Sequence, residues 1–168
     1  ADFWNSVVTL NSWHQHRIAR LITKKLFGTL SNKKIGILGF AFKANTNDTR
    51  ESAAIRICKD LLEEGAVLYI HDPKVDPNQI LKDLSNKEKP HTLENKSLFF
   101  TNQIEEAAEG SDAILVLTEW DIYSNINWND ISNLMRSPAW IFDSRSILEP
   151  NDVRSAGLNF WRIGDGAD

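Results

Sequence analysis

The sequence predicts an α/β fold in which a doubly wound, mostly parallel sheet of the Rossmann-like kind is preceded by a long N-terminal helix. Two observations lead to this prediction. From Ile35 onward, short apolar runs alternate with helix-like segments, which is typical of βαβ units with parallel strands. The stretch Phe3–Phe27 contains neither proline nor glycine and repeats apolar residues three or four apart, which is typical of one amphipathic helix.

Length and charge exclude several classes of protein. The 168 residues suffice for one domain with its own core. The formal net charge of -4 leaves no basic surface for a nucleic-acid backbone. No apolar run approaches the roughly 20 residues of a membrane span, and no signal peptide opens the chain. The single cysteine, Cys58, rules out an internal disulfide and fits a reducing, cytoplasmic location.

The N-terminal helix has two alternative roles. At 1.5 Å per residue it reaches roughly 40 Å, and Gly28 is placed to end it as a C-cap. It either packs on its own domain or forms an arm against another domain or subunit. The chain starts at Ala1, without an initiator Met and inside this helix, so we expect it to be a piece of a longer protein.

Strands and helices alternate through the rest of the chain. We expect strands at Ile35–Gly39, Val67–His71, Leu98–Thr101, Ala113–Leu117, Trp140–Phe142 and Asn159–Ile163. We expect helices at Glu51–Glu64, Pro77–Ser85, Ile104–Glu109 and Asn129–Met135. The polar segment Ser85–Ser97 is expected to be a solvated loop.

The predicted topology places a binding site at one edge of the sheet. Ligands of open parallel sheets bind beyond the carboxyl ends of the strands, where the strand order reverses. With the order 3-2-1-4-5-6, that point lies between the first and fourth strands. The loops that follow Gly39, Leu117 and Phe142 are therefore the candidate site.

The loop after the first strand has features of an anion site. It is longer than most loops between a strand and a helix, and it contains Lys43. Asp48 and Glu51 have the spacing of a capping box, so we expect the next helix to start there with free N–H groups. A helix N-terminus beside a lysine attracts anions. The alternative is that Lys43 is an ordinary solvated loop lysine.

The same loop does not have the glycine pattern of a dinucleotide-binding turn. Gly36 and Gly39 are its only glycines, and the bulky segment Phe40–Phe42 follows where the turn would need small residues. Asp72 ends the second strand, where dinucleotide folds place a ribose-binding acid, but Pro73 follows it. Ribose binding by Asp72 is therefore the less favoured of two interpretations.

The other two loops add an aromatic ring and an arginine. Trp120 either stacks on a base or packs in the core, and the second interpretation is favoured. Arg145 is expected to face the same crevice as Lys43, where the two cations would neutralise a diphosphate. The alternative is that Arg145 pairs with its neighbour Asp143. Cys58 falls on the apolar stripe of its helix and is expected to be a buried filler.

These motifs resemble those of the UDP-glucose/GDP-mannose dehydrogenase family, in particular the C-terminal, UDP-binding part of UDP-glucose 6-dehydrogenases. The resemblance rests on GFAFK at 39–43, T-x-D-x-R-E-S at 46–52, DPKV at 72–75, TEW at 118–120 and IFD-x-R at 141–145. The first helix, with Ala1, Trp4, Asn11, Arg17 and the pair Leu26-Phe27, resembles the helix that links the family's central domain to this one.

The resemblance implies a division of the chain and roles for four residues. Residues 1–28 would be the linking helix at the end of the central dimerisation domain, and residues 29–168 the UDP-sugar-binding domain. Phe42 and Lys43 would bind the UDP-sugar, Arg50 would reach NAD, and Arg145 would reach the sugar nucleotide of a partner subunit. Ser144 and Ser146 depart from the family's pattern around that arginine.

The resemblance also implies what the whole enzyme does. It would oxidise UDP-glucose to UDP-glucuronate with NAD, as a cytoplasmic homo-oligomer. The nucleophilic cysteine and most of the NAD site would lie in an N-terminal domain that precedes this chain, so no catalytic residue is expected here and the fragment is expected to be inactive. The alternatives are a related UDP-N-acetylmannosamine or GDP-mannose dehydrogenase, and a nucleotide-binding module without catalysis.

Overall fold

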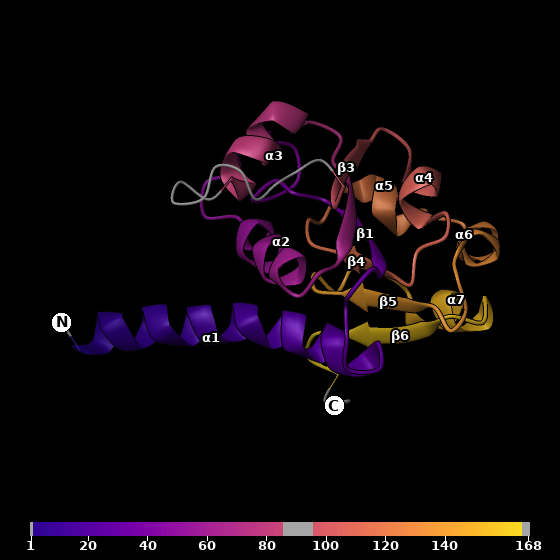
Figure 1. Cartoon of the computed structure of the whole chain (residues 1–168), viewed down its shortest axis with the longest axis horizontal. Coiled ribbons are helices and arrows are strands. Elements are labelled where there is room, and N and C mark those ends of the chain that lie inside the picture. The colour runs from indigo at the N-terminus through magenta and orange to yellow at the C-terminus, as the bar shows by residue number, and fades with distance from the viewer. Residues whose placement is uncertain (1, 86–95, 166–168) are drawn as a thin grey trace.

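A computed structural model describes residues 2–85 and 96–165, with the side chains of α1 described at 4–7 and from residue 16 onward. The predicted α/β fold is confirmed: six parallel strands form one sheet in the order β3-β2-β1-β4-β5-β6 (Figure 1). The strands are β1 (Lys34–Leu38), β2 (Val67–His71), β3 (Leu98–Thr101), β4 (Ala113–Val116), β5 (Trp140–Asp143) and β6 (Asn159–Arg162). This order places the reversal point between β1 and β4.

Seven helices accompany the sheet in the described part of the chain. They are α1 (Asp2–Lys25), α2 (Ala53–Glu63), α3 (Pro77–Leu84), α4 (Ile104–Ala108), α5 (Asp121–Ser124), α6 (Trp128–Leu134) and α7 (Pro150–Ser155). The short helices α5 and α7 were not predicted, because neither is long enough to show an apolar periodicity. Most of the predicted loop Ser85–Ser97 lies outside the described residues.

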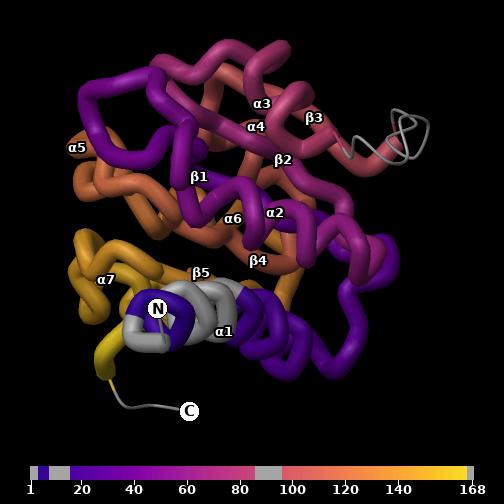
Figure 2. The backbone as a smooth tube through the Cα atoms, turned by 90° about the vertical axis from the view of Figure 1, so that its left-hand side faces the viewer, coloured from indigo at the N-terminus to yellow at the C-terminus, as the bar shows by residue number. Residues whose placement is uncertain are grey.

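The long helix α1 packs on this domain through its C-terminal half. Ala19 and Ile22 are buried there, as is Leu26 in the turn that follows, and α1 contacts α2 along its side (Figure 2). Lys25 lies over the Trp140 ring of β5 with its Nζ 5.4 Å from the ring centroid. The N-terminal turns extend past the rest of the domain (Figure 1). The helix thus covers its own sheet with one half and reaches outward with the other.

The core lies between the sheet and its helices. Strand β4 is buried along its whole length, which follows from its central position and its apolar sequence. Gly36 of β1 has no side chain because α4 crosses there: a Cβ atom would come within 2.8 Å of the Ala107 carbonyl oxygen. No helix in the described residues is long and apolar enough to span a bilayer.

Candidate functional site

Three loops that are far apart in sequence meet at one edge of the sheet. The loop after β1 is residues 39–52, the loop after β4 is 117–120, and the loop after β5 is 144–149. Leu117 N donates to Leu38 O at 2.9 Å, and Ser144 N donates to Val116 O at 3.2 Å. These backbone bonds continue the strand pairing beyond the strand ends, so the three loops leave the sheet side by side.

Asp72, at the end of β2, organises the loop after β1. Its two carboxylate oxygens accept N–H groups from Phe40 (2.7 Å), Ala41 (3.0 Å), Lys74 (2.9 Å), Val75 (3.0 Å) and the indole of Trp120 (3.3 Å). The bonds to Phe40 and Ala41 occupy the backbone donors directly after β1. In dinucleotide folds that turn receives the ligand's pyrophosphate. Here it holds the protein's own carboxylate, which favours a structural role for Asp72 over ribose binding.

The rest of the first loop is fixed at both ends. Thr118 Oγ1 donates to Ala41 O at 2.8 Å, and Ser52 Oγ donates to Phe40 O at 2.8 Å. Phe42 N donates to Asp48 O at 2.8 Å and closes the loop on itself. The tip therefore presents Phe42 and Lys43 from an ordered backbone. The Phe42 side chain is 50% exposed, an unusual position for a large apolar ring, and Lys43 is exposed beside it.

The predicted capping box is wrong. Helix α2 begins at Ala53, and its N-cap is Ser52, whose side chain accepts from Ala54 N at 3.3 Å. Glu51 has a φ of 61°, a left-handed conformation that interrupts any helix starting before it. The Asp48 side chain instead accepts the backbone N–H of Arg50, two residues further along the chain, as aspartates in tight turns do. The spacing that resembled a capping box belongs to a turn.

Arg50 is held by Asp48. Its Nη2 lies 2.7 Å from Asp48 Oδ2, and its Nε lies 3.0 Å from Oδ1. Hydrogen bonds from Arg50 lower the pKa of Asp48 to about 2, and the bond from the Arg50 side chain has a larger effect than the bond from its backbone. The carboxylate stays charged at neutral pH, and the guanidinium is 86% exposed with its position defined. Arg50 therefore offers oriented N–H donors to solvent.

The ion-pair partner of Arg145 is not Asp143, the alternative that the sequence suggests. Its Nη2 pairs with Glu119 Oε2, from the loop after β4. The Asp143 carboxylate accepts two backbone donors, Arg145 N at 3.0 Å and Leu148 N at 2.8 Å. The alternative of an Asp143–Arg145 side-chain pair is therefore wrong, because the turn after β5 uses that carboxylate for its own backbone.

The structure places Lys43 and Arg145 on neighbouring parts of the same edge without a direct contact between them. Lys43 lies in the loop after β1 and Arg145 in the loop after β5. Because β4 lies between β1 and β5 in the sheet, the loop after β4 separates them. That central loop is tied to the first by Thr118 and to the third by Glu119. In the described chain no hydrogen bond joins these two side chains.

Trp120 packs in the core, as the favoured interpretation has it. Its side chain is 6% exposed and its indole N–H is bonded to Asp72. Beneath it, the buried Tyr123 hydroxyl donates to His71 O at 3.1 Å and lies 2.9 Å from His71 Nδ1. Burial lowers the pKa of His71 and raises that of Tyr123. This buried pair joins α5 to the end of β2 and was not predicted.

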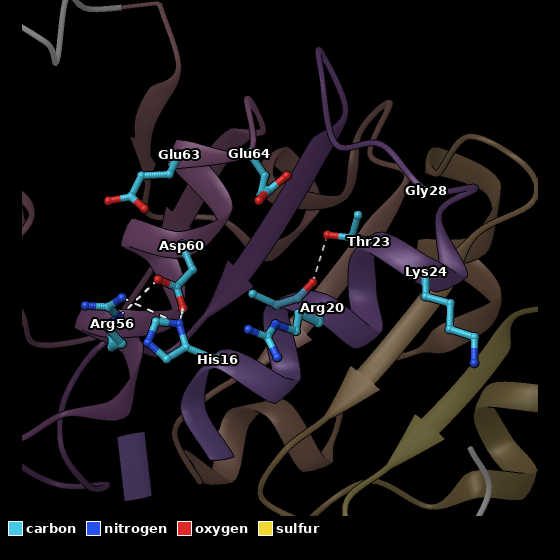
Figure 3. Close-up of a pocket in the computed structure, with 10 residues that line it drawn as sticks. His16, Arg20, Thr23, Lys24, Gly28, Arg56, Asp60, Glu63 and Glu64 are labelled. Carbon is cyan, nitrogen blue, oxygen red and sulfur yellow. Dashed lines mark hydrogen bonds and ion pairs between the residues drawn. The ribbon is translucent and has the colours of Figure 1, made fainter. Parts of the chain in front are cut away.

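Cavities also occur among the described residues outside these three loops. One is a groove of about 500 Å³ between α1 and α2, where His16 Nδ1 lies 2.9 Å from Asp60 Oδ2 and Arg56 Nε lies 3.0 Å from Asp60 Oδ1 (Figure 3). Another, of about 320 Å³, lies at the ends of β2 and β3 beside Asp72. The groove holds an ion-paired contact between two helices of the same chain and gathers residues of both charges.

Other chemistry has little support among the described side chains. No cluster of three metal-ligating groups occurs in residues 2–85 and 96–165 whose side chains are described. Cys58 is completely buried, and burial raises the pKa of its thiol, so it is suited to packing and not to nucleophilic attack.

Comparison with known proteins points to one family. Residues 36–150 match the model for the UDP-binding domain of the UDP-glucose/GDP-mannose dehydrogenase family. The UDP-glucose 6-dehydrogenase of Caenorhabditis elegans is 44% identical over 168 residues, which are all of this chain and 35% of that protein. The Drosophila melanogaster enzyme is 41% identical over 167 residues, 98% of this chain and 35% of that protein. The chain thus spans about a third of these relatives.

Solved structures share the fold. A UDP-glucose dehydrogenase from Pyrobaculum islandicum superposes with a TM-score of 0.67 at 24% identity, covering 94% of this chain and 31% of that one. A UDP-N-acetylmannosamine dehydrogenase from Pyrococcus horikoshii superposes with a TM-score of 0.65 at 25% identity, with the same coverage.

Proposed function

The chain belongs to the UDP-glucose/GDP-mannose dehydrogenase family, and we propose that it is the C-terminal, UDP-sugar-binding part of an NAD-dependent UDP-glucose 6-dehydrogenase. The whole enzyme would convert UDP-glucose to UDP-glucuronate. Its nucleophile and its NAD-binding turn would come from the rest of the protein. The curated relatives at 38–44% identity favour UDP-glucose over the UDP-N-acetylmannosamine or GDP-mannose of other family members.

One observation carries this proposal: the Asp72 carboxylate occupies the backbone donors that follow β1. A diphosphate at this edge must then be bound by side chains. We infer that Lys43 on the first loop and Arg145 after β5 do so. Lys43 supplies a point charge, and Arg145 a planar fork that orients an oxyanion through paired hydrogen bonds. The half-exposed Phe42 ring is placed to pack against the nucleotide or sugar.

The residues of this chain would contribute only a small part of the NAD-binding site. The first loop has no glycine-rich turn, and its backbone donors are bonded to Asp72, so the chain cannot hold the dinucleotide's pyrophosphate as a Rossmann turn does. Arg50 is exposed and oriented by Asp48. Because Asp48 neutralises its charge, Arg50 would offer hydrogen bonds to NAD bound by the preceding domain. NAD would accept the electrons of the oxidation.

We also propose that the enzyme is a cytoplasmic homo-oligomer. The outward-reaching turns of α1 carry Trp4, whose side chain is 71% exposed, and burying it would favour association with a partner subunit or with the enzyme's own preceding domain. The buried, reduced Cys58 is compatible with the cytoplasm.

The test is kinetic and uses the full-length enzyme. Lys43→Ala is expected to raise the KM for UDP-glucose by the loss of a charge-assisted hydrogen bond, about 1.5–3 kcal/mol. Arg145→Lys is expected to be nearly as harmful as Arg145→Ala, because both lose the fork. Lys74→Ala removes an exposed lysine from the loop after β2 and serves as the control. An Arg145→Ala enzyme with the wild-type KM would refute the diphosphate role.

A further inference from the structure

We propose that Glu119 is a positioning residue that holds the Arg145 guanidinium in the orientation needed to bind the diphosphate. The proposal rests on the proposed function of Arg145 and adds the residue through which the fold controls it. Glu119 follows β4 and Arg145 follows β5, and Oε2 of the first pairs with Nη2 of the second. The two side chains thus join the loops at the centre of the site.

Glu119 is itself held on both sides. Thr118 before it is fully buried and donates to the first loop, and Trp120 after it is buried and bonded to Asp72. The backbone of Glu119 is therefore fixed between two anchored residues. The Oε2 atom of Glu119 is shielded from solvent, and its partner in the described chain is the Arg145 guanidinium. The charge of Arg145 is therefore what compensates it.

Arg145 is fixed at its base and dependent on Glu119 at its tip. Asp143 accepts the Arg145 and Leu148 backbone N–H groups, which shapes the turn below the side chain. Beyond Cβ, an arginine still loses considerable rotamer entropy when it is ordered. The contact with Glu119 uses one terminal amino group, so other N–H groups of the fork remain for a ligand's phosphate oxygens. Arg145 is then ordered before the ligand arrives.

A second consequence concerns charge. Without Arg145, the shielded Glu119 oxygen is left as an uncompensated negative charge at the mouth of an anion site. The effect of removing Arg145 therefore includes repulsion between Glu119 and the diphosphate. Removing Glu119 should weaken binding when Arg145 is present, and should not weaken it further when Arg145 is absent.

The experiment is a double-mutant cycle in the full-length enzyme, with KM for UDP-glucose, kcat and thermal stability measured for each variant. Glu119→Ala is expected to raise the KM roughly two- to five-fold with little change in kcat, as for the loss of a partly exposed ion pair. Glu119→Gln keeps an oxygen acceptor for Nη2 and is expected to restore a KM close to the wild-type value. In the Arg145→Ala background, Glu119→Ala is expected to cause no further rise.

Asp165→Ala is the matched control, because it removes a carboxylate of similar exposure that pairs with Arg162. It should leave the KM unchanged. If Glu119→Ala raises the KM by the same factor with and without Arg145, Glu119 does not act through the arginine, and this inference fails while the proposed function stands. If both Glu119 variants lower the KM, the carboxylate competes with the ligand and the inference is wrong. If Arg145→Ala has no effect, both fail.

Discussion

Asp72, which directly follows β2, and Trp120, in the loop after β4, are joined by a hydrogen bond of 3.3 Å from the indole Nε1 to the carboxylate Oδ2. The same oxygen accepts the Phe40 and Ala41 N–H groups. One carboxylate therefore sets the first loop and the central loop relative to each other. The geometry of the site depends on a residue that is not expected to touch the ligand.

Replacing Asp72 tests this dependence. Asp72→Ala leaves five N–H donors without their acceptor, so we expect the free energy of unfolding to fall by about 3 kcal/mol and the KM for UDP-glucose to rise. Asp76→Ala is the control, because among the described residues the Asp76 side chain accepts a single backbone N–H, that of Asn78, as the N-cap of α3. Its loss should cost about 1 kcal/mol and leave the KM unchanged. Chemical denaturation and steady-state kinetics measure both, and equal losses would contradict the role given to Asp72.

Gly39 is expected to be intolerant of any side chain. It has a φ of 94°, and a Cβ atom there would lie 2.4 Å from Thr118 Cβ and 2.8 Å from Thr118 N. Gly39→Ala combines backbone strain with displacement of the central loop, so we expect a loss of roughly 3 kcal/mol or more. Gly110→Ala separates the two effects, because Gly110 has a φ of 64° and open space around it. It should cost about 1 kcal/mol, as measured by denaturation.

Stability is expected to fall on mild acidification because of His71. Burial lowers the pKa of this imidazole below its ordinary value of 6.5, so the unfolded chain binds the proton more readily than the folded one. The free energy of unfolding should be highest above pH 6.5 and decrease as the pH falls below it. Asp48 does not contribute in this window, since its pKa is about 2.

Urea denaturation between about pH 5 and pH 8 measures this dependence. His71→Asn should be less stable at every pH and should show a smaller dependence across the window. An unchanged dependence in the variant would assign the effect to other groups of the chain.

The division of the chain at residue 28 also has a measurable consequence. Ile22 of α1 and Leu26, directly after it, are at most 2% exposed and pack into the domain's own core. A chain of residues 29–168 would lose them, together with Ala19, and would expose the apolar surface that they cover. We expect it to be less stable than a chain of residues 16–168 by roughly 3 kcal/mol or more. Equal melting temperatures would support residue 28 as a true domain boundary.

The local sequence was sufficient to predict most elements and their order. Apolar periodicity is a property of neighbouring residues, so the six strands and the helices α2, α3, α4 and α6 were predicted with ends within about two residues. The predicted strand order is the one usual for doubly wound folds, and the structure confirms it. The motif residues Phe42, Lys43, Arg50 and Arg145 were identified in the loops where the structure has them, although their roles in binding stay a prediction.

Tertiary structure alone decided which partners those residues have. The sequence allows Asp72 to be a ribose ligand, but its carboxylate accepts hydrogen bonds from the loop after β1. The sequence also allows Arg145 to pair with Asp143, but its guanidinium pairs with Glu119. The start of α2 also differs from the prediction, for a local reason: Ser52 is the N-cap, and Glu51 before it has a left-handed backbone conformation. The partners of Asp72 and Arg145, in contrast, depend on distances between loops that follow different strands. Periodicity along the chain carries no information about them, because each partner is chosen by the packing of the whole sheet.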